Sequence, residues 1–255
     1  MKYTKKELIK ILKQLNLSYV SKSFIDGNEN LPSSSTFVRA FGSWSGALES
    51  ADLNVGRITG RPQDIEIEVS KQAIDIINGE LLGDGSLYLS GSYRSNACFS
   101  HSTANFHYGQ YLYDKLNKLN VPLLPSETLP ARNSSKPQFR TRTKTNKYWT
   151  KLWSKWYING QKCVPRDLIL TKESCLHWYL GDGYLEKAVK FSTCNFSIED
   201  ISFLVGLLGH CGFKASANKR SGGYYVIRIF KKDSFDFLEW IGDCPTKRYE
   251  HKWRL

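Results

Sequence analysis

"INGELLGDGSL", residues 77–87, and "HWYLGDGYL", residues 177–185, each end an apolar, helix-like run with the tripeptide Gly-Asp-Gly. One Asp-Gly pair most often marks a turn or the end of a helix, so neither copy is informative alone. The second aspartate, Asp182, follows the first, Asp84, at a distance of 98 residues. The recurrence predicts an internal repeat.

The segments that follow the two tripeptides match in kind and order. A polar, strand-like stretch ends in "CFSHS" (98–102) or "KFSTC" (190–194), and a helical pattern comes next. Each copy then continues with a second strand, "QFRTRTKT" (138–145) or "YYVIRIF" (224–230), and a further helix. The sequence therefore predicts an α+β fold built from two αββαββα halves, at 67–165 and 166–255.

The two aspartates form a candidate metal site if the helices that precede them pack side by side. Gly83 and Gly181 would then permit a close backbone approach, and Asp84 and Asp182 would emerge at the same end. Neighbouring carboxylates repel each other unless a cation lies between them, and hard oxygen ligands suit Mg²⁺. On a basic protein, a shared magnesium site predicts phosphodiester chemistry.

The charge balance favours a polyanionic partner. The chain has 36 Lys and Arg against 24 Asp and Glu, a formal charge of +12. An anionic membrane is the weaker interpretation, because no apolar run approaches the roughly 20 residues that a spanning helix needs. We therefore expect nucleic acid as the partner, and no membrane.

One basic segment is the candidate nucleic-acid surface. Residues 132–155 contain eight Lys and Arg and no acidic residue. A charge run is usually a solvated face, but Gln138, Arg140, Arg142 and Lys144 alternate, so a strand would project all four from one side. This arrangement suits a β-ribbon in the major groove of DNA.

The corresponding strand of the second half predicts a thinner version of this surface. Tyr224, Val226 and Arg228 are expected to face outward, while the residues between them are buried. In the first half we add Arg94, and His101, which ends a strand where its side chain could point at the metal or at a metal-bound water. His177 is interpreted as a structural histidine.

The cysteines and the N-terminus indicate the compartment. The six cysteines lie far apart, with no spacing typical of zinc ligands, and are interpreted as small apolar residues in a reducing compartment. The N-terminal "MKYTKKELIKILKQL" is charged throughout and has no apolar signal core. We expect an intracellular protein, in the cytoplasm, nucleoid or an organelle matrix, that is not secreted.

The first residues predict a separate module. Leu8, Ile11, Leu12 and Leu15 have helical spacing behind a Thr4–Glu7 capping box, and two or three short helices are expected by residue 53. Residues 54–64 are rich in Gly and Pro and lack periodicity. The expected organisation is a helical module at 1–55 and a linker at 56–66.

Taken together, these motifs resemble those of the monomeric LAGLIDADG homing endonucleases. "INGELLGDG" (77–85) and "CLHWYLGDG" (175–183) look like the two signature helices, and the likeness covers about residues 67–255. "NGQKCVP" (159–165) resembles the family's inter-half segment, and "YEHKW" (249–253) resembles its C-terminal lysine motif. The segment "LPSSSTFVRAFGSWSGALESADL" (31–53) resembles a short repeat attached to homing endonucleases, which implies a helix-turn-helix-like DNA-binding module.

The resemblance implies a saddle of antiparallel sheets on double-stranded DNA, with the signature helices between the halves. Asp84 and Asp182 would bind the metal, helped by the carbonyl groups of Gly83 and Gly181. Lys162 and Lys252 would polarise the nucleophile or stabilise the charged phosphorane. The implied activity is Mg²⁺-dependent cleavage of both strands at a long target, leaving short 3′ overhangs.

Two residues depart from the family pattern. His101 stands near a position where relatives often carry glutamine, and Glu80 is a charge within the first signature helix. Two interpretations of Glu80 are open: an extra acidic group near the site, and a position on the exposed edge of the helix, which is the one we expect. Two other functions remain open on the same fold: an intron RNA maturase, and a DNA-binding regulator that does not cleave.

Overall fold

The computed structural model describes residues 3–15, 20, 22–53, 66–90, 96–129 and 136–254. The chain divides into two compact units, Met1–Gln63 and Asp64–Leu255. The expected linker, 56–66, lies outside the described residues except for Glu66. In the described part of the chain every helix is too short or too polar to cross a lipid bilayer.

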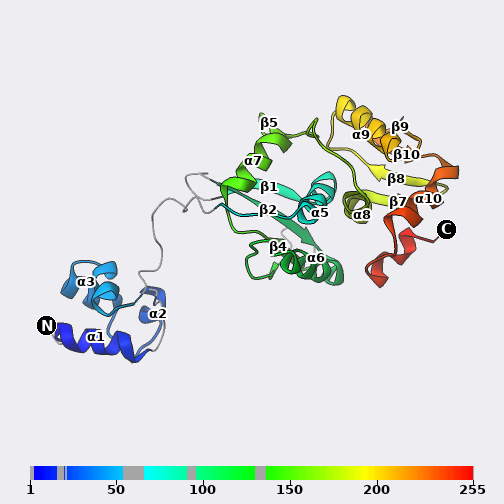
Figure 1. Cartoon of the computed structure of the whole chain (residues 1–255). Helices are drawn as coiled ribbons and strands as arrows, with labels where there is room; N and C mark the ends of the chain where they lie inside the picture. Colours follow the sequence, from blue (N-terminus) through cyan, green and yellow to red (C-terminus); the bar gives the residue numbers. More distant parts are fainter. Residues whose placement is uncertain are drawn as a thin grey trace. The chain divides into compact units, whose positions relative to one another are not determined.

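The N-terminal unit is a small helical bundle. Its helices are α1 (Lys5–Gln14), α2 (Lys22–Asp26), α3 (Ser34–Phe41) and α4 (Trp44–Ser50), drawn in blue in Figure 1. The predicted capping box is present, since the Thr4 side chain accepts from the Glu7 backbone and the Glu7 carboxylate accepts from the Thr4 backbone. Leu8 and Leu12 pack with Phe37 in a core of the unit's own.

The larger unit consists of two halves with the same order of elements. The first half contains α5 (Lys71–Leu82), β1 (Ser86–Ser90), β2 (Asn96–Thr103), α6 (Phe106–Lys118), β3 (Glu127–Leu129), β4 (Gln138–Arg142) and α7 (Lys147–Trp156). A hairpin of β5 (Tyr157–Ile158) and β6 (Gln161–Lys162) follows. The second half contains α8 (Lys172–Asp182), β7 (Gly183–Leu185), β8 (Val189–Ser192), α9 (Ile198–His210), β9 (Ala215–Lys219), β10 (Tyr225–Ile229), α10 (Lys231–Ile241) and the 3₁₀ helix η1 (Lys247–Lys252).

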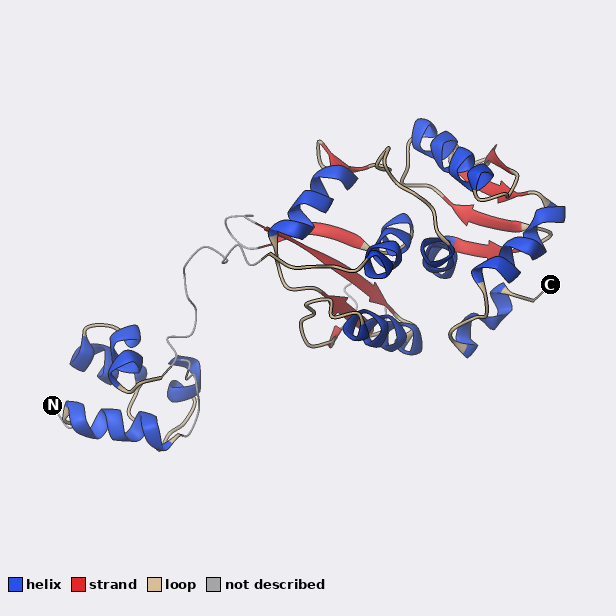
Figure 2. Cartoon of the chain, in the orientation of Figure 1, coloured by secondary structure: helices blue, strands red, loops and turns tan. Residues whose placement is uncertain are grey.

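The sheet topology confirms the predicted fold class. The strands pair antiparallel in the order β1-β2-β4-β3 in one half and β7-β8-β10-β9 in the other, so each strand has its counterpart at the same place. Figure 2 shows the strands of the two halves in red and the helices that pack beside them in blue. The repeat visible in the sequence is therefore a repeat of whole αββαββα units.

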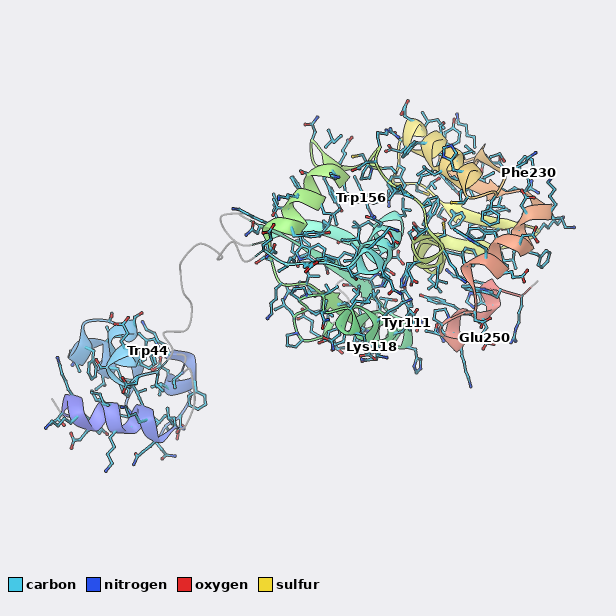
Figure 3. All side chains as sticks on the ribbon, viewed as in Figure 1. Trp44, Tyr111, Lys118, Trp156, Phe230 and Glu250 are labelled. Atoms are coloured by element: carbon cyan, nitrogen blue, oxygen red, sulfur yellow. The ribbon has the colours of Figure 1, made fainter. Side chains whose placement is uncertain are left out.

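The two signature helices, α5 and α8, lie side by side at the centre of this unit (Figure 1). Their contact depends on Gly79, where a Cβ atom would lie 2.3 Å from the Ser174 carbonyl oxygen and 2.7 Å from His177 Cβ. Such distances are impossible for a real side chain, so glycine is required there. Apolar residues of both halves form one continuous core around the pair, including Trp156, labelled in Figure 3.

Candidate active site between the two signature helices

Asp84 and Asp182 meet where α5 and α8 end. A Cβ atom on Gly181 would lie 3.3 Å from the Asp84 backbone nitrogen and 3.3 Å from Gly83 Cα, so the two chain segments touch through their glycines. Helix α5 ends at Leu82 and is capped by Gly83, whereas α8 continues through Asp182. The predicted proximity of the two aspartates is confirmed.

The two carboxylates interact electrostatically. Burial raises the pKa of Asp182, and the charge of Asp84 raises it further, to about 6, although Lys162 and Lys252 act in the opposite direction. A carboxylate whose pKa lies this high carries negative charge that its surroundings only partly compensate. A cation bound between the two carboxylates would offset the repulsion between Asp84 and Asp182.

Lys162 and Lys252 hold the same place in the two halves. Lys162 Nζ, from β6, donates to the carbonyl oxygen of Gly85 at 2.9 Å and lies 3.4 Å from that of Gly83. Lys252 Nζ, at the end of η1, donates to the carbonyl oxygens of Leu180 at 2.7 Å and Gly181 at 3.2 Å. Each lysine thus binds the carbonyl end of its own signature helix, where a positive charge is stabilised.

Burial also perturbs the two lysines. It lowers the pKa of Lys162 to about 8, against the charges of Asp182 and Asp84. It lowers the pKa of Lys252 to about 8 as well, against the same two carboxylates. The carboxyl group of Asp182 and the amines of Lys162 and Lys252, with pKa values moved toward neutrality, form a site suited to proton transfer and charge stabilisation.

The donor set fits a hard divalent cation. The described residues contain no cluster of three or more His, Cys, Asp or Glu side chains able to hold a metal. A metal would therefore bind the Asp84 and Asp182 carboxylates and take its other oxygen ligands from backbone, water or a phosphate, as Mg²⁺ commonly does. The carbonyl oxygens of Gly83 and Gly181 already accept hydrogen bonds from Lys162 and Lys252.

His101 and Glu80 differ from the sequence-based expectations. His101 is 1 % exposed, and its Nδ1 lies 2.6 Å from Glu80 Oε2. The expected DNA contact at His101 is therefore wrong, because strand β2 turns this side chain toward α5 rather than outward. Glu80 is also 1 % exposed, so its expected position on an exposed helix edge is wrong too.

The candidate DNA surface follows β4 as its alternation predicts. Gln138, Arg140 and Arg142 are half-buried on one face, while the residues between them are buried. Arg140 forms an ion pair with Glu127 of β3 at 2.6 Å, so in the protein without DNA its charge is already paired with a carboxylate. Lys144 lies beyond the end of the strand and is exposed.

The corresponding face of β10 in the second half carries fewer polar and basic side chains. Tyr224 is exposed and Arg228 is half-buried. Val226 alternates onto the same face of β10 and is not part of the apolar core that contains Ile227 and Ile229. It is only 3 % exposed, so the expectation that it adds to the outward surface is wrong. Arg94 lies outside the described residues.

Sequence reasoning missed one feature close to the site, the buried environment of Glu80. Tyr108 of α6 and His177 of α8 both contact its carboxylate. His177 is buried and paired, which agrees with its interpretation as a structural histidine. The signal available in the sequence was a charged residue in one apolar helix together with a histidine in the facing helix.

Comparison with known proteins gives a family match and two relatives that match part of the chain. The family model described as "LAGLIDADG DNA endonuclease family" matches residues 74–237. The cytochrome b mRNA maturase bI2 of Saccharomyces cerevisiae is 28% identical over 177 residues, 62% of this chain and 42% of that protein. The maturase bI2 of Debaryomyces hansenii is 24% identical over 149 residues, 55% of this chain and 56% of that protein. The chain thus matches about half the length of these relatives.

A solved structure has the same fold. The homing endonuclease I-WcaI, bound to its DNA recognition sequence, superposes with a TM-score of 0.63. Sequence identity is 18%, over 79% of this chain and 97% of that one.

Proposed function

Since the chain belongs to the LAGLIDADG DNA endonuclease family, we propose that it is a homing-type endonuclease that hydrolyses both strands of a long DNA target with a divalent metal. The observation that carries the proposal is the meeting of Asp84, Asp182, Lys162 and Lys252 at the ends of α5 and α8. Of the divalent metals, Mg²⁺ is the one we propose for the cell.

Each of the four side chains has a proposed role. Asp84 and Asp182 hold the metal, which when bound supplies a polarised water and neutralises charge on the scissile phosphate. Lys162 and Lys252 stabilise the negative charge that develops on the phosphorane. With a pKa near 8, either lysine can also accept a proton from the attacking water near neutral pH.

The proposed DNA contacts lie along the sheets. From the first half Gln138, Arg140, Arg142 and Lys144 would reach the major groove, and from the second half Tyr224 and Arg228. On DNA binding, Arg140 would leave its ion pair with Glu127 and contact a base or a phosphate instead. Since each base contact is worth about 1–3 kcal/mol, a long interface tolerates single mismatches.

The N-terminal unit and the cellular setting complete the proposal. Residues 1–55 would bind DNA beside the target and raise the local concentration of the catalytic unit. We propose that the protein acts inside the cell, as a monomer, and leaves short 3′ overhangs.

An RNA maturase is the second candidate. Its support is the similarity to two cytochrome b mRNA maturases. The basic residues of β4 serve RNA or DNA equally well, so the affinity for the host intron RNA must be compared with that for duplex DNA at the same salt.

The test of cleavage uses a duplex that carries the uninterrupted insertion site, or one selected from a randomised library. We expect the wild type to cut both strands with Mg²⁺, and Asp84→Asn and Asp182→Asn to bind the duplex but not to cut it. Asp75→Asn, which removes a carboxylate that pairs with Lys71 at 3.5 Å, is the control and should cut normally. Cleavage by either active-site variant at the wild-type rate would exclude this mechanism.

A further inference from the structure

The Glu80 carboxylate is held from three directions inside the protein. Its Oε2 lies 2.6 Å from His101 Nδ1 of β2, and its Oε1 lies 2.7 Å from His177 Nδ1 of α8. The hydroxyl of Tyr108, from α6, donates to the same Oε1. All four side chains are at most 1 % exposed. We call these four residues the Glu80 cluster.

The Glu80 cluster joins the two halves. Glu80, His101 and Tyr108 belong to the first half and His177 to the second. On its far side His177 Nε2 lies 3.5 Å from Glu173, which is paired with Lys115 of α6. Tyr111, labelled in Figure 3, stacks on the His177 ring.

Within the Glu80 cluster the negative charge of the carboxylate and the positive charges of the two histidines stabilise each other. Burial by itself would raise the pKa of Glu80, but His101 and His177 more than offset burial, and the pKa lies well below its ordinary value. Burial lowers the pKa of each histidine, yet the net shift is upward, because Glu80 acts on both and Glu173 acts on His177. Asp84 is close enough for its charge to raise the pKa of His101 as well.

The backbone of Glu80 forms the turn that carries Asp84. The Glu80 carbonyl oxygen accepts from Gly83 N at 3.0 Å and from Gly85 N at 2.7 Å. A Cβ atom on Gly85 would lie 2.7 Å from that oxygen, so the turn is folded tightly onto Glu80. One residue thus anchors the helix through its side chain and holds the Asp84 turn through its main chain.

The second half anchors its helix in a different way. Trp178, 98 residues after Glu80, stands at the corresponding place in α8 and stacks on Phe191 of β8 at 4.0 Å between ring centroids. His177 corresponds in the same way to Gly79, whose missing side chain leaves room for it. At this corresponding place α5 is therefore held by polar contacts of Glu80 and α8 by an apolar contact of Trp178.

We propose that Glu80 is a positioning residue: held by His101, Tyr108 and His177, it fixes the Gly83–Gly85 turn so that Asp84 faces Asp182. The role rests on the proposed function, because it concerns the metal site of that function. Loss of the cluster displaces Asp84 and leaves Asp182 in place. The two DNA strands are then cut with unequal losses of rate.

The test compares Glu80→Gln, Tyr108→Phe and Asp200→Asn with the wild type. Asp200→Asn is the matched control, since Asp200 is a buried carboxylate on α9 that pairs with Arg166 at 2.9 Å. Three quantities are measured: amide hydrogen exchange at residues 83–85, Mn²⁺ affinity by electron paramagnetic resonance, and single-turnover cleavage of each strand with DNA affinity determined separately.

In Glu80→Gln we expect faster exchange at residues 83–85 and Mn²⁺ binding weakened about 10-fold or more, the range seen when the partner of a metal ligand is lost. The rates of strand cleavage should fall by unequal factors, with DNA affinity unchanged. Tyr108→Phe should change the same quantities in the same direction but by smaller factors. If Glu80→Gln does not fold, the comparison is made with Tyr108→Phe instead. Asp200→Asn should leave residues 83–85, Mn²⁺ affinity and the strand ratio unchanged.

Unchanged exchange and Mn²⁺ affinity in the folded Glu80→Gln variant would overturn the positioning role. The same conclusion follows if Asp200→Asn changes these quantities equally, since the effect would then be general destabilisation. A further outcome is that neither the wild type nor any variant cuts DNA, while Glu80→Gln still loosens the turn and weakens Mn²⁺ binding. In that case the proposed nuclease function fails and the positioning role stands. If the wild type binds no Mn²⁺, both fail.

Discussion

At the scale of single residues, the site depends on groups whose ionisation is shifted toward neutrality. Asp182 has a pKa of about 6, while Lys162 and Lys252 have pKa values of about 8. Burial is the first cause in all three, and the opposite charges in the site limit the shifts. The four side chains are thus electrostatically coupled before any substrate binds.

This coupling has a measurable consequence for Asp182. In Asp84→Asn the pKa of Asp182 should fall below about 6, because the charge of Asp84 is one of the two causes that raise it. It should remain above the ordinary value of 3.8, because burial is unchanged. Carboxyl ¹³C chemical shifts against pH, in metal-free protein, measure this. Asp167→Asn removes an exposed carboxylate and should not move the pKa of Asp182.

At the scale of secondary-structure elements, the contact of α5 with α8 decides the geometry of the site. The helices approach closely because glycines stand at their points of contact, Gly79 in the middle and Gly83 with Gly181 at the end. Small residues permit this approach, and the apolar surfaces around them supply the stabilisation. A side chain at the contact must therefore separate the two aspartates as well as destabilise the fold.

Replacing helical glycines tests this directly. Gly79→Ala should lower the free energy of unfolding by about 1–3 kcal/mol or more, as overpacking of a close contact does. Gly206→Ala is the matched control in α9, where a Cβ atom meets nothing within 4 Å. That change should stabilise the protein by about 0.5–1 kcal/mol, because alanine favours the helix. Urea denaturation measures both, and equal effects would show that the packing at Gly79 is unimportant.

At the scale of the whole molecule, two cores and one buried ionic cluster determine stability. The N-terminal unit has its own apolar core, separate from the core around α5 and α8. Within the larger unit the Glu80 cluster links four elements, α5, β2, α6 and α8. Stability should therefore respond to pH through this cluster.

The sign of the pH response follows from the pKa directions. The lowered pKa of Glu80 gives stability that is present above its ordinary value of 4.5 and is lost as the pH falls through the folded-state value. The raised pKa values of His101 and His177 give stability that is present below 6.5 and is lost as the pH rises through theirs. The contribution of the cluster is thus greatest between pH 4.5 and 6.5.

We expect Glu80→Gln to cost about 3–5 kcal/mol in this window, the cost of removing one partner from a buried ion pair. Denaturant unfolding of wild type and variant across the pH range measures the difference. A cost that is independent of pH would mean that the cluster is not ionised as described. Asp200→Asn, which removes a buried carboxylate outside the Glu80 cluster, serves again as the control.

The N-terminal unit can be tested by truncation. A chain that begins at residue 66 should unfold cooperatively and keep the pKa shifts of the site, because the core of the larger unit lies within residues 67–253. It should bind the target duplex more weakly, since a tethered second module raises affinity by about 10²–10⁴ at most. Fluorescence anisotropy with target and unrelated duplexes measures this. Equal affinity with and without residues 1–65 would remove the DNA-binding role of the module.

The sequence alone determined the repeat, the order of the elements and the place of the two aspartates. Gly-Asp-Gly recurs at a fixed offset, and apolar periodicity around each copy is a local property that the chain carries in any context. The alternation of Gln138, Arg140 and Arg142 was predictable for the same reason, because side chains alternate along every strand.

Only the tertiary structure decided the burial of Glu80, the inward direction of His101 and the pKa values of the site. A glutamate in a helix is normally expected at the surface, because burying its charge without partners is costly. Tyr108 and His177, which make its burial possible, stand 28 and 97 residues away in sequence. No local pattern joins such residues: Tyr108 meets Glu80 only when the first half folds, and His177 meets it only when the two halves pack through Gly79.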